Sequence, residues 1–143
     1  MNPMLLVAEG DPELREDYQR YLARCGYAVE SAADGLECLD KLRRLMPAVL
    51  VLDRELRWGG GDGVLAWLRE QDAFARASVV LTATAAAPAD AYALVRRPVI
   101  KFLPKPFTLT ALLESVRAAV VDNSREEQFY LNRQSACPEL FIG

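Results

Sequence analysis

The sequence feature that most constrains the fold is the apolar run Ala48–Leu52, which ends in the carboxylate of Asp53. A short, unbroken run rich in Val and Leu is typical of a strand buried on both faces of a parallel sheet. An Asp at the carboxyl end of such a strand would lie at the edge where open α/β folds place their functional groups. Many strands end in Asp only to begin a turn, so the interpretation depends on what other strands bring to that edge.

Four more short apolar runs alternate with segments of helical periodicity. The runs are Met4–Ala8, Tyr27–Ala32, Ser78–Thr82 and Val99–Leu103. The helices are expected from Pro12 to Gly26, from Leu36 to Leu45, around Val64 to Leu68, over Pro88–Val95 and after Thr108. This alternation predicts an α/β fold, a doubly wound five-stranded parallel sheet with helices on both faces.

Composition excludes several classes of function. A net charge of −3 gives no basic footprint for nucleic acid. The chain contains no histidine, which excludes a Ser-His-Asp nucleophile and an HExxH metal site. Cys25, Cys38 and Cys137 form no CxxC pair. No signal peptide is visible and no apolar run approaches the roughly 18 residues of a membrane span, so we expect a cytoplasmic protein without membrane contact.

Polar groups follow four of the five predicted strands. They are Glu9, Asp53, Thr82 and Lys105. Because the carboxyl ends of parallel strands lie at one edge, these groups should meet there. The acids could hold Mg²⁺ through oxygen ligands, the carboxylate could act as a nucleophile toward phosphorus, and the hydroxyl and ammonium could bind a phosphoryl group. The pattern indicates phosphoryl acceptance on Asp53.

Taken together, these segments resemble the receiver domain of two-component response regulators. The residues that carry the resemblance are Leu5–Glu9 with Asp11–Arg15, Ala33–Gly35, Val51–Asp53, Val80–Ala83 and Phe102–Phe107. It covers Met4 to about Val121, most of the chain, and suggests a stand-alone, chemotaxis-type receiver. The resemblance implies a flavodoxin-like strand order of 2-1-3-4-5. It also implies that a phosphohistidine on a sensor kinase or phosphotransfer protein donates its phosphoryl group to Asp53.

The same resemblance implies roles for individual residues. Lys105 would pair with the phosphoryl group, Thr82 would move to bind it, and Ala83 would leave room beside it. Phe102 matches the aromatic residue that turns inward on activation. The Lys105–Pro106 bond would often be cis. Magnesium would be held by Glu9, Asp53 and the residue two past it, Glu55, through its backbone carbonyl.

One position departs from the family pattern. Receivers usually carry two adjacent acids after the first strand, whereas this chain has Glu9 and Gly10. One carboxylate fewer should weaken Mg²⁺ binding. Either Glu9 or the side chain of Glu55 reaches the ion and function is retained, or the chain is a degenerate receiver that serves as a docking module without phosphorylation.

The last 22 residues, 122–143, lie outside the receiver pattern at 1–121. Ser124–Glu127 has the form of a capping box, which favours a short helix through Phe129 to Leu131. The apolar finish Leu140–Ile142 suggests that this extension packs on the domain or on a second copy. Output is expected through a downstream protein target, because too few residues remain for a DNA-binding domain.

Two enzyme-like alternatives are less consistent with the sequence. A haloacid-dehalogenase-like phosphatase also uses Asp, Thr and Lys, but that family places its nucleophile on an early strand with a second Asp two residues later. Here Asp53 follows the third strand and Glu55 occupies the later position. A flavodoxin is disfavoured because no Ser/Thr-rich Gly loop follows the first strand. We therefore expect a phosphoacceptor and not an enzyme with a separate substrate.

Overall fold

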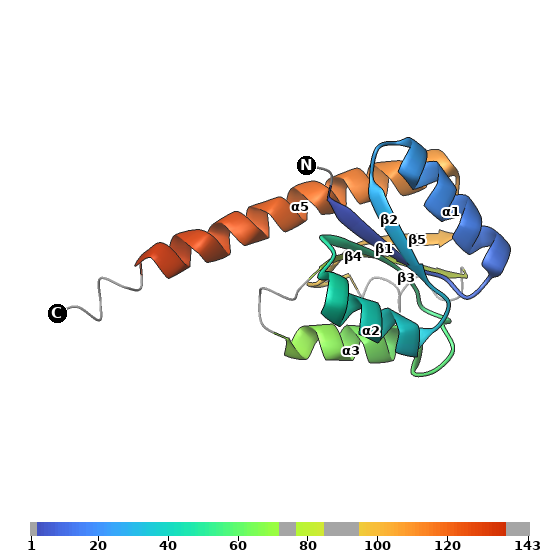
Figure 1. The fold of residues 1–143 in the computed structure, drawn as a ribbon, viewed down its shortest axis with the longest axis horizontal. Coiled ribbons are helices and arrows are strands. Elements are labelled where there is room, and N and C mark those ends of the chain that lie inside the picture. The colour runs from blue at the N-terminus through green and yellow to red at the C-terminus, as the bar shows by residue number, and fades with distance from the viewer. Residues whose placement is uncertain (1–2, 72–76, 85–94, 137–143) are drawn as a thin grey trace.

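The computed structural model describes residues 3–71, 77–84 and 95–136. Its centre is a parallel sheet in the order β2-β1-β3-β4-β5, as predicted (Figure 1). The strands are β1 (Met4–Ala8), β2 (Ala28–Ala32), β3 (Val49–Asp53), β4 (Ser78–Thr84) and β5 (Val99–Lys105). The central strand β3 is buried along its whole length, which agrees with its unbroken apolar sequence.

Helices cover both faces of the sheet (Figure 1). They are α1 (Pro12–Arg24), α2 (Gly35–Leu45), α3 (Gly60–Glu70) and α5 (Leu109–Ala136). Most of the helix expected over residues 88–95 lies outside the described residues. The arrangement of the four described helices confirms the doubly wound architecture.

Each face of the sheet has its own core because successive strand residues point to opposite sides. Leu50 and Leu52 of β3 pack in a core with α2 and α3. Val49 and Val51 of the same strand pack in the other core, with α1 and α5. Burial on both faces fixes the register of β3 and therefore the position of Asp53 at its end.

Side-chain caps set where the helices begin. The Asp11 carboxylate accepts the N–H of Glu13 at 2.9 Å, and Pro12 is the first residue of α1. The Thr108 hydroxyl oxygen accepts the N–H of Ala111 at 3.0 Å at the start of α5. Both helices begin where the sequence predicted, at Pro12 and after Thr108. The caps fix the loops that follow β1 and β5, on either side of Asp53.

The last helix differs from the prediction. The sequence suggested one helix to about Val121 and a separate short helix from Ser124, whereas α5 is continuous over 28 residues. No Gly or Pro interrupts residues 109–136, so nothing in the sequence forces the helix to stop. Its C-terminal half projects beyond the sheet (Figure 1). The division into residues 1–121 and 122–143 remains a prediction.

A polar cluster at the opposite edge of the sheet from Asp53 anchors the middle of α5. Arg97, before β5, donates two hydrogen bonds to the Asp122 carboxylate, at 2.7 and 3.1 Å. The Ser78 hydroxyl donates to the same carboxylate at 2.8 Å. Beyond this anchor, Phe129 and Leu131 are exposed. Contact between this segment and a second copy remains a prediction.

Candidate functional site: a phosphoryl-acceptor pocket

Asp53 ends β3 at the carboxyl edge of the sheet, and its side chain is only 6% exposed. Its Oδ1 accepts the backbone N–H of Glu55 at 3.0 Å, which orients the carboxylate. The other oxygen, Oδ2, lies 4.0 Å from the point that a Cβ on residue 10 would occupy. Oδ2 therefore faces the loop that follows β1.

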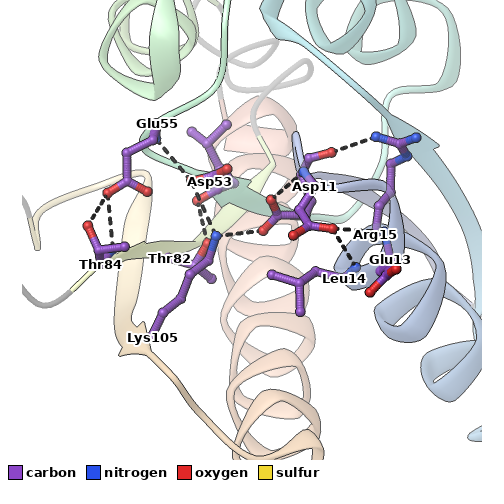
Figure 2. Close-up of polar contacts among 11 residues, drawn as sticks. Asp11, Glu13, Leu14, Arg15, Asp53, Glu55, Thr82, Thr84 and Lys105 are labelled. Carbon is purple, nitrogen blue, oxygen red and sulfur yellow. Dashed lines mark hydrogen bonds and ion pairs between the residues drawn. The ribbon is translucent and has the colours of Figure 1, made fainter.

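Lys105 points at Asp53 (Figure 2), and Glu9 meets both, as the sequence predicted. Lys105 Nζ lies 2.7 Å from Glu9 Oε1 and 3.6 Å from Asp53 Oδ1. The second oxygen of Glu9 accepts the N–H of Asp11 at 2.9 Å. Arg15, which the sequence analysis missed, donates to the Glu9 backbone carbonyl at 3.0 Å and so holds the end of β1.

The charge of Lys105 is set by two opposing effects. Burial lowers the pKa of Lys105, but the hydrogen bond to Glu9 and the negative charges of Asp53 and Glu9 outweigh it and raise the pKa above its ordinary value. Lys105 is therefore a protonated ammonium at neutral pH. A cation so placed can stabilise negative charge that develops on or beside Asp53.

Thr82 and Ala83 lie on the neighbouring strand. Thr82 pairs with Asp53 in the β3–β4 register, and its hydroxyl donates to the Leu52 carbonyl at 3.5 Å. Both residues are buried. Phe102, opposite Leu81 on β5, is half-buried against the core under α2 and α3. Their placement agrees with the expected positions, and their roles in switching remain a prediction.

The side chain of Glu55 contacts Thr84, the last residue of β4. Its Oε1 accepts both the backbone N–H of Thr84 at 3.0 Å and the Thr84 hydroxyl at 2.8 Å. Figure 2 shows this carboxylate directed at the end of β4. The sequence analysis missed Thr84, although its place two residues after Thr82 puts both on the same side of the strand.

An aromatic contact that the sequence pattern does not reveal lies near the site. Tyr18 of α1 stacks on Phe107, just after β5, with ring centroids 5.4 Å apart. Burial, followed by the negative charges of Glu9 and Asp53, raises the pKa of Tyr18, so this phenol stays neutral. The stack holds the loop after Lys105 against the helix that follows Glu9. The Lys105–Pro106 bond in this loop is cis, as the resemblance implied.

A cavity of about 600 Å³ opens beside Asp53. Its lining includes Glu9, Gly10, Asp34, Asp53, Glu55 and Trp58. Trp58 lies in the loop before α3, and the loop packs closely on α2, where Gly35 donates its N–H to the Arg57 carbonyl at 2.8 Å. The Asp53 carboxylate thus borders an opening that is largely acidic.

The residues present do not fit a divalent cation well. Glu9 is paired with Lys105, Glu55 is directed at Thr84, and position 10 has no side chain. Among residues 3–71, 77–84 and 95–136, no three His, Cys, Asp or Glu side chains are grouped so that they could hold a metal ion. These side chains therefore do not assemble a cation site by themselves, and magnesium binding through Glu9, Asp53 and the backbone carbonyl of Glu55 remains a prediction.

The family follows from comparison with known proteins. The model of the response regulator receiver domain matches residues 5–117. The chain belongs to the response-regulator receiver domain family. This receiver is 35% identical over 130 residues to the response regulator MprA of Mycobacterium tuberculosis, covering 82% of this chain and 50% of that protein. It thus spans about half the length of the curated relatives it matches.

Solved structures support the fold. The chemotaxis response regulator CheY4 of Vibrio cholerae superposes with a TM-score of 0.74 at 23% identity, covering 83% of this chain and 99% of that one. A CheY-like receiver domain protein from Methanospirillum hungatei gives a TM-score of 0.77 at 18% identity, with 88% and 99% coverage. At these identities the likeness concerns the fold alone.

No helix in the described part of the chain combines the length and the apolar character needed to cross a bilayer.

Proposed function

We propose that this receiver accepts a phosphoryl group on Asp53 from a phosphohistidine of a sensor kinase or phosphotransfer protein. The observation that carries the proposal is the setting of Asp53: a buried carboxylate at the end of β3, 3.6 Å from the Lys105 ammonium and open to a cavity. Such a carboxylate is a nucleophile with its charge partner already in place.

In the proposed step, Asp53 Oδ2 attacks phosphorus. The new O–P bond forms as the N–P bond to the donor imidazole breaks, and the released imidazole takes up a proton. Oδ2 is the attacking atom because Oδ1 accepts the N–H of Glu55, whereas Oδ2 lies beside Gly10 and the cavity. The Glu55 N–H thus fixes the carboxylate in one orientation for attack.

Lys105 balances the charge of the product. The acyl phosphate carries more negative charge than the carboxylate it replaces. The ammonium, held between Glu9 and Asp53, needs only to shift toward the phosphoryl oxygens to pair with them. The buried carboxylate of Glu9 keeps it protonated until then.

Thr82 and Phe102 would carry the signal to the surface. The Thr82 hydroxyl bonds the Leu52 carbonyl at 3.5 Å, the outer limit of a hydrogen bond, so exchanging this bond for a phosphoryl oxygen costs little. Movement of Thr82 would shift β4 against β5, where Phe102 is half-buried. We propose that the β4–β5 end of the sheet is the surface whose shape changes for a downstream protein.

The experiment is intact mass spectrometry after incubation with phosphoramidate, a small phosphodonor. The wild-type chain should gain the mass of one phosphoryl group. The matched variant Asp53→Asn has the same shape but no nucleophilic carboxylate and should gain none. Equal gain by both chains, or none by either, would contradict the proposal. The second result would instead favour the docking module, for which Gly10 is the specific observation.

We further propose that the chain acts as a signalling acceptor in the cytoplasm and not as an enzyme, at most assisting its own phosphorylation and dephosphorylation. Its net charge of −3 supports protein partners over nucleic acid for this segment. Turnover of a generic phosphate ester would contradict this proposal and favour the phosphatase alternative.

A further inference from the structure

The negative charge of Glu9 and Asp53 at the acceptor site must be balanced by a cation. We ask which cation this is on the basis of the proposed function. We propose that in this receiver the Lys105 ammonium, and not a divalent cation, balances Glu9 and Asp53, and that the missing side chain at Gly10 is the cause. The chain would then accept its phosphoryl group without magnesium. A single carboxylate at position 10 would create the cation site.

The first support is that each acidic side chain near Asp53 already has a partner. Glu9 is nearly fully buried and uses both carboxylate oxygens, one for the Lys105 ammonium at 2.7 Å and one for the Asp11 N–H at 2.9 Å. The Oε1 atom of Glu55 accepts two hydrogen bonds from Thr84. A cation would have to displace the Lys105 or the Asp11 contact before gaining the Glu9 carboxylate as a ligand, and the Glu55 side chain is held by Thr84.

The second support is the charge at the site. Two carboxylates, Glu9 and Asp53, and one ammonium, Lys105, together carry one net negative charge. The ammonium lies within 4 Å of both carboxylates. Mg²⁺ strips its hydration shell reluctantly and is held by carboxylates that repel one another in its absence. Here Lys105 already relieves that repulsion, so the gain on binding Mg²⁺ is small.

The third support is the space at Gly10. A Cβ at this position would meet only the Ala33 carbonyl at 3.9 Å and Asp53 Oδ2 at 4.0 Å, both ordinary contacts. A Cβ atom therefore fits there without strain. An Asp would place a third carboxylate beside the acceptor oxygen, where Lys105 alone could not balance it.

The test is isothermal titration calorimetry with Mg²⁺ on the wild type, Gly10→Asp and Gly10→Asn. The Asn variant fills the same space without the charge. We expect Gly10→Asp to bind Mg²⁺ at least about tenfold more tightly than both other chains. Comparable affinity of the wild type and Gly10→Asp would overturn the proposal. So would a gain of the same size in Gly10→Asn, because the cause would then not be the carboxylate.

The second arm measures phosphoryl uptake from phosphoramidate with Mg²⁺ or with a chelator. In this step the P–N bond of the donor breaks and an O–P bond forms on Asp53. The leaving nitrogen takes up a proton from water and departs as ammonia. Equal uptake under both conditions by the wild type supports the inference, and uptake only with Mg²⁺ overturns it while leaving the proposed function intact. Absence of uptake under both conditions contradicts the proposed function, and with it phosphoryl transfer without metal. The calorimetry decides the role of Gly10 independently of this result.

Discussion

Lys105 and Glu9 come from opposite ends of the receiver sequence and form a buried ion pair, with Nζ 2.7 Å from Oε1. Their side chains are 16% and 3% exposed. Breaking such a pair from one side leaves a charge buried without its partner, which costs more than the pair contributes. Several predictions about stability and charge depend on this contact.

Replacing Lys105 with Met should destabilise the fold by about 3 kcal/mol, because Glu9 and Asp53 would be left buried without a cation. Chemical denaturation at neutral pH measures this loss. The double variant Lys105→Met with Glu9→Gln should recover part of it, since one of the two unpaired charges is gone. If the losses of stability in the single variants Lys105→Met and Glu9→Gln add up to the loss in the double variant, the two residues do not interact.

The pair also predicts how stability depends on pH. The folded-state pKa of Lys105 is raised above 10.5, so its contribution is fully present below pH 10.5 and is lost as the pH rises through the folded-state value. Denaturation curves between neutral and strongly alkaline pH should show the wild type losing more stability than Lys105→Met over this upper range. Parallel curves for the two chains would contradict the assignment.

Two glycines should respond in opposite ways to the same substitution. A Cβ on Gly35 would lie 2.1 Å from the Trp58 carbonyl oxygen, whereas one on Gly63 would meet nothing within 4 Å. Gly35→Ala must displace the loop before α3 and should cost about 2 kcal/mol or more. Gly63→Ala, within α3, should instead stabilise the chain by about 0.5–1 kcal/mol. Thermal unfolding of the two variants checks both signs.

The contact between Glu55 and Thr84 gives a further prediction. Thr84→Val removes the hydroxyl that donates to Glu55 at 2.8 Å but keeps the shape and the backbone N–H. At this exposed site the loss should be about 1 kcal/mol. In a double-mutant cycle with Glu55→Ala, which removes the acceptor, the two losses should add to more than the double variant shows. Strict additivity would mean that the hydroxyl bond contributes nothing to stability.

The sequence predicted the fold and the members of the site because both follow from the strand pattern. Glu9, Asp53, Thr82 and Lys105 lie at or near the carboxyl ends of neighbouring parallel strands, so their meeting is a consequence of topology. The strand pattern of the sequence does not encode the direction in which a flexible side chain points. For this reason the attachment of Glu55 to Thr84 became visible only in the structure.

The segment predicted as a helix after Ser124 is helical, but it is the continuation of α5 and not a separate element. Capping boxes are short local signals, and the one at Ser124 falls inside a segment that contains no helix breaker. Continuation of α5 needs no new nucleation, and the Arg97–Asp122 contact holds the helix at that point. Local patterns do not include a tertiary contact of this kind.

The central claim is that Asp53 itself becomes an acyl phosphate. Reduction with borohydride converts a phosphorylated aspartate to homoserine, and peptide mapping by mass spectrometry then locates it. After treatment with phosphoramidate, we predict homoserine at position 53 in the wild type, and no homoserine at any other Asp and no 5-hydroxynorvaline at any Glu, Glu9 and Glu55 included. Modification at another residue, or an unmodified residue 53 in a chain that has gained mass, would contradict the account.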